Sequence, residues 1–281
     1  MQDKPKISII LPAIRQDRWD GMYESLLSGC KKYTFELIIC GPLPLTEKLQ
    51  NDPRVKYAKD LGSPTRCSNI AAELAEGELV TWIADDALVI EDSIDKNIDE
   101  LLSMGESDRN VVIYKYYEGK NGTDKALPPD YYYLLNSSGN FSPYIEAHWF
   151  LFNNPGMYRS FFEELGGLDC FYEACPMAHN DLAARAQNLG AVVKITQFPV
   201  LDCDHMEGGT VDHMAIFVSQ THRDQPKYQG RYRNPNWRTD VQMRIPMDNW
   251  KLQPQIWTQR FKRVPTSYAD ILKMNEETPN E

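Results

Sequence analysis

Short runs of aliphatic and β-branched residues alternate with amphipathic segments along the first half of the chain. Each run is bounded by Pro, Gly or charged residues, which predicts buried strands. The strand-like runs lie at residues 6–11, 35–40, 55–58 and 79–83. Residues 19–30 and 68–75 have apolar side chains at helical spacing, which predicts two helices between the strands. Strands that alternate with helices favour an α/β fold with a mostly parallel central sheet flanked by helices.

The second half of the chain is less regular. We expect further strands at 111–117, 148–152 and 191–195, and helices at 157–165 and 181–189. After about residue 218 the pattern dissolves into Pro-, Arg- and aromatic-rich sequence. We therefore expect one domain over residues 1–218 and a basic, aromatic extension, residues 219–281, that packs on it.

Polar residues gather where the expected strands end. In open parallel sheets, ligands bind beyond the carboxyl ends of the strands, so the segments 12–15, 41–44 and 85–86 should meet at one crevice. The adjacent carboxylates of Asp85 and Asp86 repel each other in a partly buried cleft. Mg²⁺ or Mn²⁺, which prefer oxygen ligands, would relieve that repulsion. The structural alternative is an Asp that caps the next turn.

Composition and charge narrow the class of protein. The chain has 281 residues, of which 42% are hydrophobic and 25% charged, as in ordinary globular proteins. Its net charge of −10 argues against binding nucleic acid, which needs a basic surface. Residues 221–263, however, are strongly basic. This asymmetry is typical either of an anion site or of a solvated surface segment.

Cysteine spacing and hydropathy predict the compartment. The six cysteines form no Cys-x-x-Cys pair, which excludes zinc-ribbon and thioredoxin-like sites. The N-terminus lacks a signal-peptide pattern, and no run approaches the ~20 apolar residues of a membrane span. We therefore expect a soluble, cytoplasmic protein without a transmembrane segment. Peripheral membrane association and a homo-oligomer stay open.

Four motifs, in order along the chain, resemble family 2 glycosyltransferases. The stretch NIAAELAEGELVTWIADD, residues 69–86, resembles the family's Asn-x-Gly, Gly-Glu, apolar strand and Asp-Asp motif. KISIILP and FELIICG resemble its first two strands, and residues 161–182 resemble its aromatic, Gly-Gly-Phe-Asp and Glu-Asp segment. The resemblance covers roughly residues 6–205. It implies a GT-A fold with a donor half at about 1–110 and an acceptor half at about 111–218.

The resemblance also implies an activity. It is the metal-dependent, inverting transfer of a sugar from a nucleotide-sugar donor to a hydroxyl acceptor. By position, Asp85 would lie near the ribose, Asp86 would bind Mn²⁺ or Mg²⁺, and Asp181 would be the general base. A carboxylate base suits this chemistry because a sugar hydroxyl is a poor nucleophile until its proton is taken. A helix cap is the structural alternative for Asp181.

Further residues are candidates for binding the metal and the donor. His205 is a candidate second metal ligand, with His213 and His222 as competitors. Candidate donor contacts are Pro12, Ile14, Arg15, Arg66 and Asn69. Lys227, Arg231 and Arg233 of the basic segment could also close over phosphates as a lid.

The chain departs from the family pattern at two places. Residues 40–43 read Cys-Gly-Pro-Leu where the family's second strand usually ends in Asp-Asp-Gly-Ser, which contacts the nucleotide base. The base therefore cannot be assumed to be uridine. Ile83 stands where many relatives carry an additional Asp.

Two other functions compete with sugar transfer. A sugar nucleotidyltransferase usually has a Gly-rich loop after the first strand, but residues 11–16, LPAIRQ, contain no Gly. A non-catalytic module of the same fold that binds a nucleotide sugar or carbohydrate is the remaining alternative. The presence of Asp85, Asp86 and Asp181 together favours the enzyme. The acceptor could be a glycan, a protein or a lipid-linked sugar.

Overall fold

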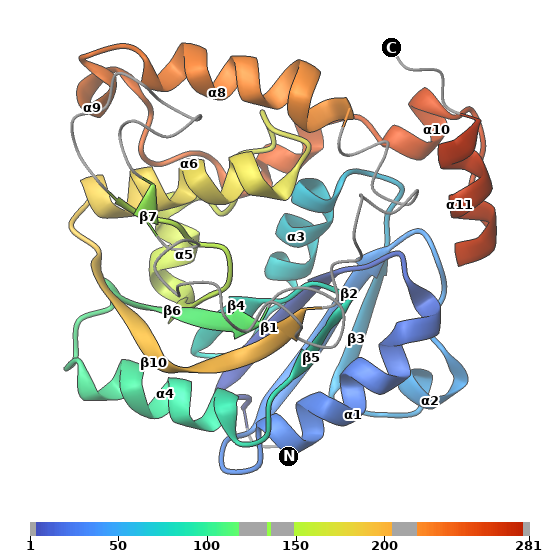
Figure 1. Cartoon of the computed structure of the whole chain (residues 1–281), viewed down its shortest axis with the longest axis horizontal. Coiled ribbons are helices and arrows are strands. Elements are labelled where there is room, and N and C mark those ends of the chain that lie inside the picture. The colour runs from blue at the N-terminus through green and yellow to red at the C-terminus, as the bar shows by residue number, and fades with distance from the viewer. Residues whose placement is uncertain (1–3, 118–133, 136–148, 204–217, 278–281) are drawn as a thin grey trace.

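One curled sheet with helices on both faces forms the body of the molecule (Figure 1). The computed structural model describes residues 4–117, 134–135, 149–203 and 218–277. Helices α3, α6 and α8 lie on one side of the sheet in Figure 1, and α1 and α4 lie on the other.

The strands and helices follow the expected alternation through the first half of the chain. The strands are β1 (Ile7–Pro12), β2 (Phe35–Gly41), β3 (Val55–Lys59), β4 (Leu79–Trp82), β5 (Ala87–Val89), β6 (Asn110–Tyr117), β7 (Leu134–Leu135), β8 (Trp149–Phe150), β9 (Pro155–Tyr158) and β10 (Val192–Cys203). The helices are η1 (Gln16–Arg18), α1 (Trp19–Gly29), α2 (Glu47–Gln50), α3 (Pro64–Glu73), α4 (Ser93–Ser103), α5 (Arg159–Leu165), α6 (Cys175–Asn188), η5 (Gln220–Asp224), α8 (Gln225–Tyr232), α9 (Trp237–Asp240), η6 (Met247–Leu252), α10 (Ile256–Arg260) and α11 (Tyr268–Glu276).

The main sheet has the strand order β3-β2-β1-β4-β9-β6-β10-β5. Its β3–β2, β2–β1, β1–β4 and β6–β10 pairs are parallel. Antiparallel pairing enters where β9 inserts between β4 and β6, and where β5 joins the edge beside β10. The prediction of an α/β fold with a mostly parallel central sheet flanked by helices is therefore confirmed, and the carboxyl ends of β1, β2 and β4 lie side by side.

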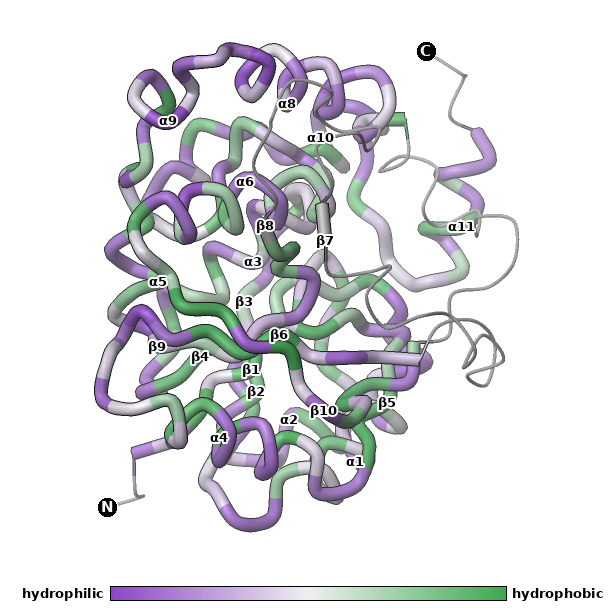
Figure 2. The backbone as a smooth tube through the Cα atoms, turned by 60° about the vertical axis from the view of Figure 1, so that its left-hand side comes forward, coloured by the Kyte–Doolittle hydropathy of each residue, from purple (hydrophilic) through white to green (hydrophobic). Residues whose placement is uncertain are grey.

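The core lies on both faces of the sheet because the strands alternate with a period of two. In β1, Ile10 packs with the core beneath α3 and α6, whereas Ile9 and Leu11 pack with the core beneath α1 and α4. In β2, Ile38 and Leu37 divide between the two faces in the same way. Figure 2 shows apolar strands at the centre of the molecule and polar residues along the outer helix α8.

Two predicted helices begin earlier in the structure than the apolar pattern indicated. Helix α3 begins at Pro64 because Ser63 is its N-cap, with the Ser63 hydroxyl accepting from the Arg66 N–H at 3.2 Å. Helix α6 begins at Cys175 and has a proline in its first turn, so Asp181 lies in its interior. The prediction that Asp181 opens this helix was wrong. The sequence pattern also missed α4 and β9.

The basic C-terminal segment contributes side chains to the core of the body. Tyr228, Tyr232 and Trp237 are buried in the core on the α6 side, and Ile256 and Trp257 in the core on the α1 side. Its charges pair with acids of the preceding body. Arg260 lies 2.8 Å from Glu173, and Arg244 lies 2.5 Å from Glu164. Ion pairing across this interface thus accounts for part of the charge asymmetry in the sequence.

The end of α5 requires a glycine. Gly166 has a φ of +80°, and a Cβ there would lie 1.8 Å from the Ile245 carbonyl oxygen. We therefore expect Gly166→Ala to lower the free energy of unfolding by more than about 1 kcal/mol, measured by denaturant titration. Gly21→Ala is the matched control, since Gly21 is an exposed position of α1 and nothing lies within 4 Å of the added Cβ. It should raise stability by about 0.5–1 kcal/mol. Equal effects of the two substitutions would contradict this account.

Candidate functional site

A cavity of about 570 Å³ opens at the carboxyl ends of β1, β2 and β4. Its wall includes the loop after β1, the end of β2, the first turns of α3 and α6, and the end of β4. The C-terminal segment completes it through Gln220, Ile256 and Trp257. This is the crevice that the strand pattern predicts, and the wall contains four of the predicted residues, Pro12, Ile14, Arg15 and Asp85.

Asp85 fixes the shape of the cavity floor. Its Oδ2 accepts hydrogen bonds from the backbone N–H groups of Ile14 and Arg15, each at 2.7 Å. Its Oδ1 accepts from the Arg15 guanidinium, and both side chains are buried. One carboxylate therefore ties the end of β4 to the loop after β1. A contact from Asp85 to a ribose stays a prediction.

Asp86 lies beside the same arginine, with 3.6 Å between its Oδ2 and the Arg15 Nη2. The Arg15 guanidinium thus supplies positive charge next to both neighbouring carboxylates. Within the described ranges there is no group of three or more His, Cys, Asp or Glu residues that could hold a metal ion. His205 and His213 lie outside the described residues, and His222 is exposed on η5. The metal-binding roles of Asp86 and His205 stay predictions.

Arg66 and Asn69 do not line the cavity in the described part of the chain, and their contact with a donor stays a prediction. Arg66 pairs with Asp60, with 2.8 Å between its Nε and Oδ1, and donates to the carbonyls of Trp250 and Gln253. The Asn69 side chain makes two hydrogen bonds to the backbone of Leu168. It accepts from the Leu168 N–H at 2.9 Å and donates to the Leu168 carbonyl at 2.7 Å. Both residues join distant segments of the chain.

Asp181 is fully buried and does not line the cavity. Arg185 and Arg231 each donate to it at 2.7 Å, and the Tyr232 hydroxyl donates at 2.8 Å. Burial alone raises the pKa of Asp181, but the two guanidinium groups outweigh burial and hold that pKa below its ordinary value. A weakly basic carboxylate with no access to the cavity does not suit the predicted role of general base.

Arg231 is engaged in ion pairs and is not free to close over a bound phosphate. Besides Asp181, its Nη1 donates to Asp169 at 2.7 Å, and its guanidinium packs against the Phe171 ring at 4.9 Å. Lys227 donates to the Phe171 carbonyl at 2.8 Å. The prediction that these two residues close over phosphates as a lid is therefore not supported by their contacts.

His179, which none of the sequence motifs singles out, lines the cavity from α6. Its side chain is only 8% exposed, and its ring lies 5.0 Å from that of Trp82 at an interplanar angle of 32°. Its buried Nε2 has no hydrogen-bond partner among the described residues. Burial lowers the pKa of His179 to about 3, so the imidazole is neutral at pH 7. Pro176 was the signal that would have placed His179 in the first turns of a helix at the cavity.

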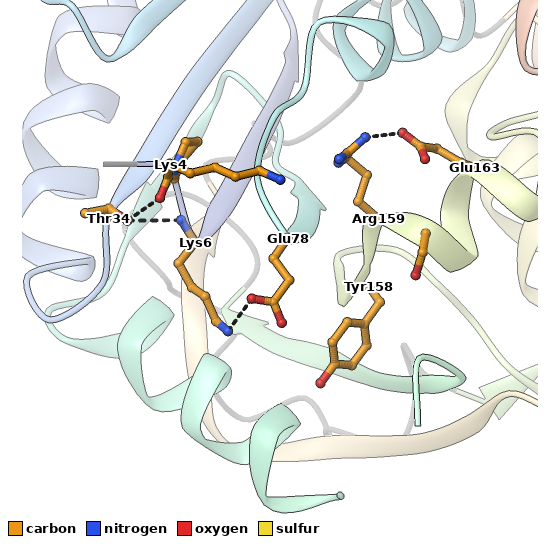
Figure 3. A pocket seen from close by; sticks show the side chains of 9 residues that line it. Lys4, Lys6, Thr34, Glu78, Tyr158, Arg159 and Glu163 are labelled. Carbon is orange, nitrogen blue, oxygen red and sulfur yellow. Dashed lines mark hydrogen bonds and ion pairs between the residues drawn. The ribbon is translucent and has the colours of Figure 1, made fainter. Parts of the chain in front are cut away.

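A second hollow, of about 500 Å³, lies at the amino ends of β1 and β4 (Figure 3). Its charged side chains are largely engaged with one another. Lys6 pairs with Glu78 at 2.7 Å, and Arg159 pairs with Glu163 while its Nε donates to the Gly77 carbonyl at 2.7 Å. The charged groups of this hollow are already paired with one another, and ligands of such sheets bind at the carboxyl ends of the strands. Both points favour the cavity at the carboxyl ends as the functional site.

Neither a family model nor a curated protein matches the sequence, but solved structures share its fold. A crystal structure of S. aureus TarS 1-349 in complex with UDP matches with a TM-score of 0.52 at 14% identity, over 84% of this chain and 72% of that one. TarS 1-349 alone matches with a TM-score of 0.50 at 18% identity, over 71% and 60% of the two chains. The longer TarS structure matches with a TM-score of 0.51 at 14% identity, over 79% and 41%.

These likenesses define the fold class. Our chain shares the fold of these TarS structures, a GT-A-like α/β fold, which confirms the predicted fold class. The chain spans 60% of the first TarS fragment and 41% of the longer TarS chain. In the described part of the chain, no helix is both long enough and apolar enough to cross a bilayer.

The buried contacts of Asp181 predict a structural effect of its removal. Asp181→Ala leaves Arg185 and Arg231 without their shared carboxylate, so it should lower the free energy of unfolding by about 3–5 kcal/mol in denaturant titrations. Asp248→Ala, which removes an exposed carboxylate on η6, should change it by less than about 0.5 kcal/mol. An Asp181→Ala variant as stable as the control would contradict the structural role.

Buried, neutral His179 predicts a pH effect on stability. Its folded-state pKa of about 3 lies below the ordinary 6.5, so between these values the unfolded chain binds a proton that the folded chain does not. Stability must therefore fall as pH falls through this window. Between pH 5.5 and 4.5, the wild type should lose about 1.4 kcal/mol more than His179→Gln. If the free energies of unfolding of the two proteins change equally with pH in denaturant titrations, the low folded-state pKa of His179 is contradicted.

Proposed function

We propose that the chain transfers a sugar from a nucleotide-sugar donor, bound in the cavity at the carboxyl ends of β1, β2 and β4, to a hydroxyl acceptor. The observation that carries this proposal is the position of the cavity in a GT-A-like fold, with Arg15 at its wall. The TarS complex with UDP supports a nucleoside diphosphate as the leaving group. The nucleotide base is left open because Cys40 and Gly41 line the wall where the family places acidic residues.

The cavity suits departure of a diphosphate. Arg15 brings a guanidinium to a wall otherwise built largely from apolar groups such as Ile14, Ile83 and Trp257. Because Asp85 and Asp86 lie beside the guanidinium, Arg15 offsets carboxylate charge at this wall, and further positive charge for a diphosphate would have to come from a bound metal ion. Asp85 holds Arg15 in place before any ligand arrives, so no reorganisation is needed during the reaction.

We propose that a divalent ion, Mn²⁺ or Mg²⁺, assists donor binding, with Asp86 as a protein ligand and His205 as a second. Mg²⁺ commonly uses one or two protein carboxylates together with substrate phosphates and water. The buried acid at position 86, beside that at 85, fits this requirement. When bound, the ion would neutralise charge on the leaving diphosphate.

The proposed transfer is a direct displacement. The acceptor hydroxyl attacks the anomeric carbon from the side opposite the diphosphate, which inverts the configuration. A glycan, a protein or a lipid-linked sugar can each supply the hydroxyl.

A non-catalytic binding module remains the second candidate. The burial of Asp181 between arginines, away from the cavity, is the observation that favours it, because the carboxylate expected to act as base is not at hand. A module would bind the donor without turnover.

A panel of UDP- and GDP-linked sugars, with and without Mn²⁺, tests the proposal by thermal shift and by release of nucleoside diphosphate. A true donor at 100 times its Kd should stabilise the protein by about 2.7 kcal/mol. Asp86→Ala should remove the Mn²⁺-dependent part of this stabilisation, whereas the control Asp248→Ala should keep it.

The outcomes separate the candidates. Donor-dependent stabilisation with turnover supports the transferase, and stabilisation without turnover supports the binding module. If no nucleotide sugar in the panel stabilises the protein or is consumed, the proposed donor site is wrong.

A further inference from the structure

The cavity wall is built from segments that lie far apart in the chain. Its charged groups, Arg15 and Asp85, follow β1 and β4 directly. Gln220 and Trp257, in contrast, come from the C-terminal segment, where Gln220 begins η5 and Trp257 lies on α10. Helix α10 has only five residues, and helices this short are not stable alone. The position of its wall residue therefore depends on tertiary contacts.

The polar contacts behind these two wall residues meet at one buried carboxylate, Glu173, which is 8% exposed. Its Oε2 accepts from Arg260 at 2.8 Å and from the Ser219 hydroxyl, and Arg260 also donates to that hydroxyl at 3.0 Å. Arg260 lies three residues after Trp257 on α10, and Ser219 directly precedes Gln220. Burial raises the pKa of Glu173, but the Ser219 hydroxyl and Arg260 outweigh burial and hold that pKa below its ordinary value.

Further contacts of Glu173 extend this cluster to the helices on the other side of the cavity. The Glu173 carbonyl accepts from the Thr65 hydroxyl, in the first turn of α3, at 2.9 Å. Its N–H donates to the Asp224 carboxylate at 2.9 Å, which also accepts from the N–H of Ala174, the N-cap of α6, at 2.6 Å. Arg223 of η5 donates to the Glu173 Oε1 at 3.0 Å. One residue thus links the first turns of α3 and α6 to the C-terminal segment.

We propose that Glu173 is a positioning residue for donor binding, because it holds the C-terminal part of the cavity wall in place. Through Arg260 it fixes Trp257, and through Ser219 it fixes Gln220. This inference rests on the proposed function, and it makes the C-terminal segment part of the donor site. Trp257 is also held by burial in the core on the α1 side, but apolar burial has no direction, whereas hydrogen bonds between charged groups do. The cluster therefore adds a directional constraint to the packing of α10.

The cluster should act on donor binding and leave the chemical step unchanged. Glu173, Ser219 and Arg260 lie outside the described lining of the cavity, so they reach a donor only through the wall residues beside them. A wall that is ordered before the donor arrives lowers the entropic cost of binding. Loss of the cluster should thus raise the donor Kd and KM while kcat is kept.

The test uses the full chain and the nucleotide sugar from the panel that gives the largest thermal shift. Calorimetric titration gives the donor Kd, and release of nucleoside diphosphate gives kcat and KM. Arg260→Gln and Glu173→Gln should each raise the donor Kd and KM by about 5–150-fold, the range typical of coupled sites. Arg260→Lys, which keeps the positive charge, should recover part of the lost affinity. Arg244→Gln is the matched control, because it breaks an ion pair between the same segment and α5 outside the described cavity wall, and it should keep the wild-type Kd.

A double-mutant cycle separates positioning from a general loss of stability. If Glu173 and Arg260 act on the donor through each other, the double variant should weaken binding by clearly less than the product of the two single effects. Circular dichroism and thermal unfolding without donor show whether each variant is folded. If Glu173→Gln does not fold, Ser219→Ala takes its place in the cycle, since it removes one neutral hydroxyl of the same cluster.

Three results would overturn the inference and leave the proposed function intact. The first is folded Arg260→Gln with the wild-type donor Kd, and the second is an equal loss of affinity in the control Arg244→Gln. The third is a cycle in which the two single effects multiply, because the two residues would then act independently. If the wild type binds none of the nucleotide sugars, the proposed function is refuted and this inference with it.

Discussion

The Asp85 carboxylate shapes the candidate site more than any other single group. By accepting from the Ile14 and Arg15 N–H groups and from the Arg15 guanidinium, it joins the end of β4 to the loop after β1. Arg15 is thereby kept at the cavity wall next to Asp86. This buried pair has hydrogen bonds on both carboxylate oxygens, the condition under which burying a charge is tolerated. The position of Arg15 and the link between β4 and the loop after β1 both depend on this Asp85–Arg15 pair.

Much of the donor half could be predicted from local patterns. The apolar runs of β1, β2 and β4 are short and bounded by Pro, Gly or Asp, so their carboxyl ends, and the crevice there, follow from sheet geometry. Arg15 and Asp85 were therefore predicted to lie at the crevice, and they do. The division of the chain into donor half, acceptor half and extension stays a prediction.

The roles of several polar residues could not be predicted, because their partners are distant in sequence. Asp181 pairs with Arg231, which lies 50 residues further on, and Arg66 bonds to the carbonyl of Gln253, 187 residues away. A motif match fixes the identity of such a residue but not whether it faces the cavity or the core. On α6, a helix start misplaced by six residues hid His179, whose side chain does line the cavity. Strand β9 was missed because its four residues, PGMY, contain neither a β-branched run nor a period of two.

The most direct test of the central claim is a crystal structure of the protein with the nucleotide sugar that stabilises it most. Our account predicts density for the donor in the cavity between Arg15 and His179, with the diphosphate near the Asp85–Arg15 pair. Donor density in the hollow beside Lys6 and Arg159, or elsewhere on the surface with this cavity empty, would contradict it.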